Sequence, residues 1–340
     1  MYDKRNEIGG NIMTYEEKLQ QYKDWIFRRS AYQMALAIIS IDKQTVAPSA
    51  GAAYRDERSA YLAGELFSIE TDPAMVQLLK ELKDDPQIDG DNKRAVELYY
   101  KQAMDTMCIP KEEFVAYQKL RDESFDAWIN AKSQSDYSIF EPYLKKIIEV
   151  SKKMYRYRNS DKNLYDQMLD DYEPGMTQEK YDVFFAALKE RLVPLIQKIT
   201  QAKQKNEAFL HQEFPIEDQK KFMTQLLEYL HFDSSWGYQN ESEHPFTSWT
   251  CENDCRTTTK YVKNDVISAV LSTVHEVGHA YYEHNVDPKY DGMILSEGIS
   301  SGMHESQSRL CENYLARTTA FWQYHYPKLQ ETFPTQLGNV

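Results

Sequence analysis

Long apolar runs and an export signal are both missing from this sequence of 340 residues. A membrane-spanning helix needs about 18 or more consecutive apolar residues, and no stretch approaches that length. Residues 1–14 are polar and lack the apolar core of a signal peptide, so no export route is visible. We therefore predict a cytoplasmic protein that does not span a membrane.

Cysteine is scarce as well. The four cysteines, Cys108, Cys251, Cys255 and Cys311, are too few for a disulfide framework in a chain of this length, which favours reduced thiols. Cys251 and Cys255 stand close together in Cys-Glu-Asn-Asp-Cys and could in principle hold a metal. No second Cys/His pair lies nearby, so this pattern supports a metal site only weakly.

An excess of positive charge is absent too. The formal net charge is −13, and no run rich in lysine or arginine stands out. An acidic surface repels phosphate backbones and anionic lipids. The charge balance therefore argues against nucleic acids and membranes as partners.

Glycine and proline, which interrupt helices, are sparse at 12 each. Residues 111–132 and 140–155 each show an amphipathic helical pattern. A further apolar stripe with helical spacing consists of Leu188, Leu192, Leu195 and Ile199. Pro194 is expected to kink that segment. We predict that such stripes form the core of a mostly helical protein.

Strand signals are few. The best lies at residues 256–262, Arg-Thr-Thr-Thr-Lys-Tyr-Val, which are rich in β-branched and aromatic types. No Gly/Ser-rich linker, internal repeat or low-complexity tract divides the chain. The pattern favours one continuous, mostly helical body with little sheet.

The strongest motif is His-Glu-Val-Gly-His at residues 275–279. Asn264 or Asp265 can cap a helix that starts near residue 266 and carries this motif. His275 and His279 are four apart, so both imidazoles point from one helix face at a single cation. Glu276 lies beside them, where it can move a proton between water and a leaving amine. A chance match could fall anywhere, whereas this one falls on a helix with a polar face.

A catalytic zinc usually has three protein ligands and an open position. The downstream candidates for the third ligand are Glu283, Asp287, Asp291, Glu297, Glu305 and Glu312. Residues 296–313 are predicted to form a second helix, on which small residues at 298, 301 and 302 share a face with Glu305. Small side chains let two helices approach closely, so we favour Glu305, with Glu297 as the alternative.

The sequence resembles the thermostable carboxypeptidase 1 family, the carboxypeptidase Taq metallopeptidases. The resemblance rests on the motif at 275–279 together with His-Glu-Ser-Gln-Ser-Arg-Leu-Cys-Glu-Asn at 304–313. Further matches are His-Pro-Phe at 244–246, Asp-Cys-Arg-Thr-Thr at 254–258 and Asp-Asp-Tyr-Glu-Pro-Gly-Met-Thr at 170–177. The similarity extends weakly back to about residue 15.

This resemblance implies a large, mostly helical fold with a deep groove, a small β-sheet beside the metal site, and a homodimer. It implies a metal-dependent carboxypeptidase that releases single C-terminal amino acids from peptides. His275, His279 and Glu305 would bind one divalent metal ion per chain, zinc first and cobalt as the alternative. Glu276 would be the catalytic general base.

Two further residues are implied to border the substrate groove, His244 and Arg256. Each also has a simpler interpretation. Arg256 could only pair with Asp254 or another carboxylate, and His244, which precedes a proline, could only cap a turn. His304 and Arg309 are interpreted as structural members of their helix.

The chain departs from the family pattern at two places. Residues 41–44, Ile-Asp-Lys-Gln, stand where the family has a tryptophan before Asp-x-Gln-Thr. Family members also continue for about a third of their length beyond the position of residue 340, and that part carries two motifs associated with the substrate. We therefore expect residues 1–340 to be a single metallopeptidase domain that lacks its C-terminal third, with uncovered apolar surface near residues 321–333.

Two other functions remain open at this point. A related zinc endopeptidase would share the same metal motif and cut short peptides internally. An inactive fragment of such an enzyme would bind metal without turnover.

Overall fold

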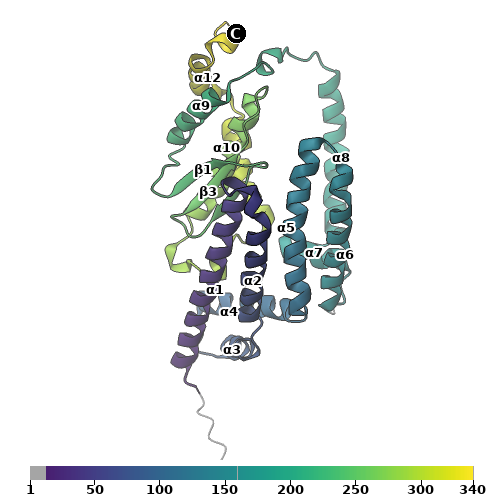
Figure 1. The fold of residues 1–340 in the computed structure, drawn as a ribbon, viewed down its shortest axis with the longest axis vertical. Coiled ribbons are helices and arrows are strands. Elements are labelled where there is room, and N and C mark those ends of the chain that lie inside the picture. The colour runs from purple at the N-terminus through teal and green to yellow at the C-terminus, as the bar shows by residue number, and fades with distance from the viewer. Residues whose placement is uncertain (1–12, 159, 340) are drawn as a thin grey trace, which may run out of the picture.

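Helices make up most of the chain, as the sequence predicts (Figure 1). The computed structural model describes residues 13–158 and 160–339, so most of the polar segment 1–14 lies outside the described residues. The helices are α1 Tyr15–Thr45, α2 Ala52–Glu70, α3 Pro73–Asp84, α4 Gly90–Thr106, α5 Lys111–Gln134, α6 Glu141–Tyr157, α7 Leu164–Tyr172, α8 Gln178–Gln201, α9 Ile216–Tyr229, α10 Val266–His284, α11 Ser301–Arg309, α12 Thr319–Thr332 and α13 Pro334–Leu337. Among the described residues, no helix has the length and apolarity needed to cross a bilayer.

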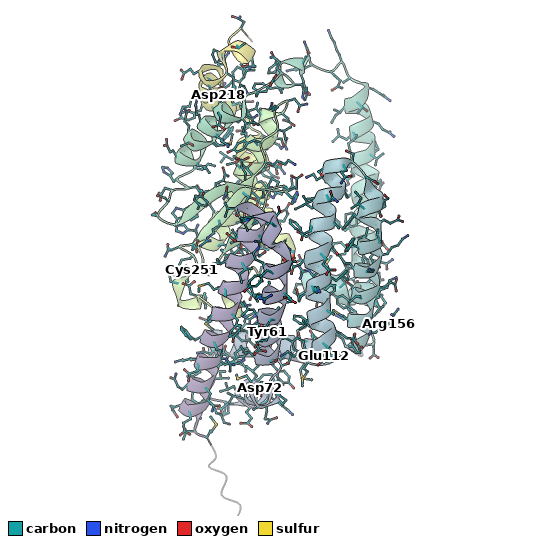
Figure 2. The ribbon with its side chains drawn as sticks, in the orientation of Figure 1. Tyr61, Asp72, Glu112, Arg156, Asp218 and Cys251 are labelled. Atoms are coloured by element: carbon teal, nitrogen blue, oxygen red, sulfur yellow. The ribbon has the colours of Figure 1, made fainter. Side chains whose placement is uncertain are left out.

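The N-terminal helices share a core of their own. The Thr14 hydroxyl accepts a hydrogen bond from the Glu17 N–H, and the Glu17 carboxylate accepts one from the Thr14 N–H, so a capping box starts α1. Tyr22 of α1 then packs with buried residues of α3 and α4, among them Leu79 and Tyr99. Figure 2 draws the side chains on the ribbon and labels Asp72, which caps α3.

A second core surrounds α10. Its fully buried apolar side includes Val266, Val270, Val274 and Val277, as the sequence pattern predicts. Phe321 and Phe333 also belong to this core, so the expectation of uncovered apolar surface at 321–333 is wrong for both. The reason is local packing, because the Phe333 ring meets the Phe214 ring edge-on at 5.1 Å and Tyr229 of α9 packs against Phe321.

The prediction that the apolar stripe of α8 is core is wrong. No residue of α8 is buried, and Leu188, Leu192, Leu195 and Ile199 are 40%, 42%, 50% and 55% exposed. Helical periodicity reports that a helix has an apolar face but not what covers it. The described part of the chain places no partner over this face. Pro194 lies inside the continuous helix.

The small sheet lies against α10. Strand β3, Cys255–Thr259, is its central strand, parallel to β1, Gly237–Glu241, and antiparallel to β2, Thr247–Trp249. The strand predicted at 256–262 therefore exists, although it begins and ends earlier. Four of its five residues are buried, which suits a strand with neighbours on both edges and a helix on one face.

Candidate metal centre

The helix that carries the histidine motif begins where the sequence places it. The Asp265 carboxylate accepts a 2.9 Å hydrogen bond from the Ser268 N–H and caps α10. The valine side of α10 faces the core, so the opposite side carries His275 and His279 at the edge of the packed interior. Both imidazoles are largely buried but keep some contact with solvent.

Helix α11 approaches α10 closely at Gly278. A Cβ atom at this position would lie 2.8 Å from the Ser308 Cα and 3.1 Å from the Gln307 carbonyl oxygen. Backbone atoms cannot rotate out of the way, so only glycine permits this crossing. The close approach brings Glu305 of α11 to the two histidines of α10.

Two of the small residues predicted to smooth the second helix, Gly298 and Gly302, do not serve that purpose. The helix begins at Ser301 rather than at 296, with the Ser300 side chain as its cap, so Gly298 lies outside it. A Cβ at Gly302 would meet the Glu173 carboxylate, not α10. Glu305 therefore lies next to the two histidines, but Gly278 of α10, rather than small residues on α11, allows this approach.

Three donor atoms converge at this crossing. The Nε2 atoms of His275 and His279 lie 3.5 and 3.3 Å from Glu305 Oε2, and all three atoms fall within 4.8 Å of one another. Two imidazoles and a carboxylate are the donor set of many catalytic zinc sites. The residues present therefore fit a single divalent cation.

The other ring nitrogens are occupied. His275 Nδ1 lies 2.9 Å from Glu312 Oε2, and His279 Nδ1 lies 2.5 Å from His304 Nδ1. Burial lowers the pKa of His279 to about 4, with the neighbouring His304 as a second cause, so this ligand candidate is neutral at pH 7. A neutral imidazole is the form that binds a cation.

Glu305 is held in its charged form. Burial acts to raise its pKa, but hydrogen bonds from Arg309 and Ser308 outweigh that effect and lower the pKa of Glu305. The Arg309 Nε–H donates to Glu305 Oε1 at 2.8 Å, which leaves Oε2 facing the histidines. Arg309, interpreted from sequence as a structural member of its helix, thus contacts a donor of the candidate site directly.

Glu276 lies on the sheet side of α10 and is 7% exposed. Burial raises the pKa of its carboxyl group, and a hydrogen bond from Thr247 opposes the rise. The Thr247 hydroxyl lies 2.6 Å from Glu276 Oε2, which fixes the carboxylate from strand β2. Thr247 carries no signal in the sequence beyond its position next to His-Pro-Phe.

The two substrate residues suggested by the family resemblance lie on or next to the sheet. Arg256 forms a two-point ion pair with Asp254, at 2.7 and 2.8 Å, as the simpler interpretation predicted. His244 precedes β2, its carbonyl accepts from the Ser242 hydroxyl, and its ring lies 6.5 Å from that of Trp128 of α5. A substrate role for His244 and Arg256 stays a prediction.

The remaining ligand candidates have other partners. Glu297 lies 3.6 Å from the Arg29 guanidinium, and Asp287 caps a short helical turn. The Glu283 carboxylate contacts His304 and the Glu312 carboxylate contacts His275. None of these four belongs to the group formed by the Nε2 atoms and Glu305.

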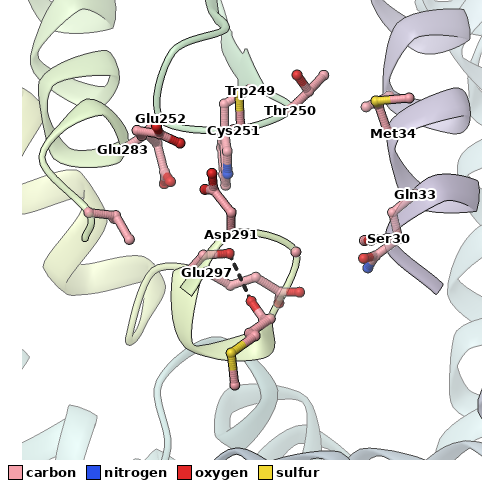
Figure 3. Close-up of a pocket in the computed structure, with 15 residues that line it drawn as sticks. Ser30, Gln33, Met34, Trp249, Thr250, Cys251, Glu252, Glu283, Asp291 and Glu297 are labelled. Carbon is pink, nitrogen blue, oxygen red and sulfur yellow. Dashed lines mark hydrogen bonds between the residues drawn. The ribbon is translucent and has the colours of Figure 1, made fainter. Parts of the chain in front are cut away.

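A separate pocket of about 310 Å³ lies between α1, the loop after β2 and the segment before α11 (Figure 3). Cys251, Glu252 and Asp291 bring donor atoms within 4.8 Å of one another there. Cys255 is not part of this group, because it is buried in β3 with its thiol directed at the Ala280 carbonyl. The paired-cysteine arrangement considered from sequence is thus not the one that the structure forms.

The family model and the curated proteins that match this chain are all carboxypeptidases. The family model of the carboxypeptidase Taq (M32) metallopeptidases matches residues 21–340. Carboxypeptidase 1 of Bacillus subtilis is 37% identical over 331 residues, which cover 97% of this chain and 66% of that protein. Thermostable carboxypeptidase 1 of Thermus thermophilus is 31% identical over 327 residues, which cover 92% and 64%.

A solved structure agrees with these relatives. The crystal structure of the M32 carboxypeptidase from Deinococcus radiodurans R1 has a TM-score of 0.85 at 30% identity, over 95% of this chain and 65% of that one. The chain thus spans just under two thirds of the length of the curated relatives it matches.

Helical architecture, a small sheet and these matches together define the class as metallopeptidase. Within that class, the chain belongs to the carboxypeptidase Taq (M32) metallopeptidase family. The resemblance drawn from the motifs is confirmed, as is the mostly helical fold with its small sheet.

Proposed function

We propose that this chain carries the metal centre of a metal-dependent carboxypeptidase. The observation that supports the proposal is the convergence of His275 Nε2, His279 Nε2 and Glu305 Oε2 within 4.8 Å, on the helix that also carries Glu276. In this proposal the three donors hold one divalent ion, zinc or cobalt. When bound, the ion polarises the scissile carbonyl and makes water a stronger acid.

Glu276 acts as the general base. Its carboxylate takes a proton from the attacking water as the new C–O bond forms. The same proton then passes to the nitrogen of the leaving amine as the C–N bond breaks, so Glu276 returns to its starting state. Thr247 contributes by holding the carboxylate in one orientation, at 2.6 Å.

The exopeptidase direction comes from the family. The relatives named above are carboxypeptidases, and a carboxypeptidase must recognise the terminal carboxylate of a peptide. In this proposal Arg256 and His244 border the groove in which the peptide lies, and Asp254 orients the Arg256 guanidinium. The family resemblance also supports a single metallopeptidase domain over residues 1–340 that acts as a homodimer. The scarcity of cysteine supports a cytoplasmic location.

Paired peptides test this function. The zinc-loaded protein is incubated with one peptide that has a free C-terminus and with the same sequence as a C-terminal amide, and products are identified by mass spectrometry. We expect stepwise loss of single residues from the free peptide only. Internal fragments from both peptides would instead indicate an endopeptidase. Bound zinc without turnover of either peptide would indicate a metal-binding protein that is not a peptidase.

A further inference from the structure

Two buried carboxylates outside the donor set lie behind the candidate ligand histidines. Glu312 is 6% exposed and Glu283 is 2% exposed. We propose that Glu312 and Glu283 are positioning residues that fix the tautomers of His275 and His279, so that both Nε2 lone pairs face the same point. This inference rests on the proposed metal function and adds two residues that no part of that function requires.

Glu312 acts on His275 directly. An ionised carboxylate can only accept hydrogen bonds, so the 2.9 Å contact of Glu312 Oε2 requires a proton on His275 Nδ1. In a neutral imidazole, a proton on Nδ1 leaves the lone pair on Nε2. The Nε2 atom of His275 is the one that lies 3.5 Å from Glu305.

Two arginines keep Glu312 in its acceptor role. The Arg309 and Arg317 guanidinium groups donate to its two oxygens at 2.8 and 2.7 Å. Arg309 also bonds Glu305, so it ties the ligand carboxylate to the positioning carboxylate. Glu312 lies in the π-helical segment Leu310–Ala316 that continues α11. Such segments are rare and occur frequently at functional sites.

Glu283 acts on His279 through a third histidine. Glu283 Oε1 lies 2.6 Å from His304 Nε2. Burial raises the pKa of Glu283 and the hydrogen bond with His304 opposes the rise, and the ionised carboxylate requires a proton on that nitrogen. A neutral His304 then offers its Nδ1 lone pair to His279 Nδ1–H, 2.5 Å away. His279 is left with a free Nε2 lone pair, on the atom that lies 3.3 Å from Glu305. The charge of one buried carboxylate thus selects the tautomer of an imidazole that it does not touch.

Packing prevents His304 from turning away. The Trp249 ring stacks on its imidazole at 5.5 Å and 24°, and the Tyr282 ring lies 4.9 Å away. Glu283 and Trp249, which both contact His304, also line the pocket in Figure 3. Because the His304 ring is held in place, it keeps its hydrogen bonds to Glu283 and His279 at the same time.

The tautomers can be measured without any variant. The metal-free wild-type protein is labelled with ¹⁵N-histidine, and the ring-nitrogen shifts report which nitrogen carries the proton. We expect protonated Nδ1 on His275 and His279 and protonated Nε2 on His304. A proton on Nε2 of His279 or His275 in the metal-free protein would overturn the inference.

Conservative variants test the consequence for binding. Glu312→Gln and Glu283→Gln keep the side-chain shape, but an amide can also donate and so no longer enforces one tautomer. We expect each to bind Co²⁺ about 10- to 100-fold more weakly in competition with a chelator, and to change the visible absorption of the bound Co²⁺. Asp56→Asn is the matched control, since Asp56 is a buried carboxylate paired with Lys43 on other helices.

The outcomes separate the two proposals. Wild-type affinity and an unchanged Co²⁺ absorption in both folded variants would refute the positioning role and leave the metal function intact. A wild-type protein that binds no divalent ion would refute both. If a variant fails to fold by circular dichroism, the ¹⁵N shifts of the wild-type protein decide the question alone.

Discussion

Gly278→Ala is the substitution that probes the helix crossing most sharply. The new Cβ would lie 2.8 Å from the Ser308 Cα, about 0.6 Å inside the 3.4 Å at which ordinary contact begins. Alanine gains about 1 kcal/mol of helix propensity over glycine, whereas overpacking costs about 1–3 kcal/mol. The net loss of stability is about 0–2 kcal/mol, so we expect a folded protein.

The larger effect of Gly278→Ala falls on the metal site. Relief of the clash requires α11 to shift by about 0.6 Å, which exceeds the roughly 0.5 Å within which a binding constellation must be held. Glu305 moves with α11, so we expect zinc affinity to fall by on the order of 10-fold or more. The assay is a chelator competition, run beside thermal unfolding of the metal-free protein.

A matched control separates the crossing from a general glycine effect. Gly302→Ala places its Cβ 2.5 Å from the Glu173 carboxylate, which is the flexible end of a side chain. We expect zinc affinity close to that of the wild type in this variant. Wild-type zinc affinity in Gly278→Ala as well would refute the claim that this glycine sets the position of Glu305.

Three further outcomes are expected. Glu305→Ala should remove most bound zinc while Glu297→Ala keeps it, measured by elemental analysis after dialysis; the reverse result would assign the third ligand to Glu297. Thr247→Val removes the hydroxyl bonded to Glu276, the proposed general base. We expect kcat for C-terminal residue release to fall roughly 10- to 100-fold, the equivalent of about 1.4–2.7 kcal/mol, and an unchanged kcat would exclude the orienting role. Leu195→Glu on the exposed face of α8 should change the free energy of unfolding by less than about 0.5 kcal/mol, whereas Leu79→Ala in the core should cost about 2–5 kcal/mol in urea unfolding; equal losses would show that the α8 face is buried in solution.

Local patterns in the sequence were enough to predict helix α10, which carries the candidate metal ligands. A cap at Asn264 or Asp265, the buried valine side and the two histidines on the opposite face follow from sequence and helical geometry. The structure selects Asp265 as the cap and agrees with the other two. Glu305 was also named from the sequence, but for a reason that the structure does not support. The decisive close contact is at Gly278, inside the motif, and its partner atoms belong to a helix 30 residues away in sequence.

Features that depend on tertiary packing could not be predicted from the sequence. The stripe of α8 looks like any core-facing helix, because periodicity carries no information about the partner. The approach of Glu312 to His275 depends on a π-helical segment, and that of Glu283 depends on how His304 packs against Trp249. Glu283 and Glu312 were both candidate ligands in the sequence. Only the structure shows that Glu305 lies at the Nε2 atoms of the histidines, whereas Glu312 contacts His275 Nδ1 and Glu283 contacts His304.

The central claim is that a metal held by His275, His279 and Glu305 works together with Glu276 as the base. The most direct test compares wild type with Glu276→Gln, measuring zinc content and C-terminal residue release on the same preparations. The account predicts one zinc per chain in both proteins and loss of turnover in the variant alone. Turnover retained by Glu276→Gln with its zinc in place would contradict it.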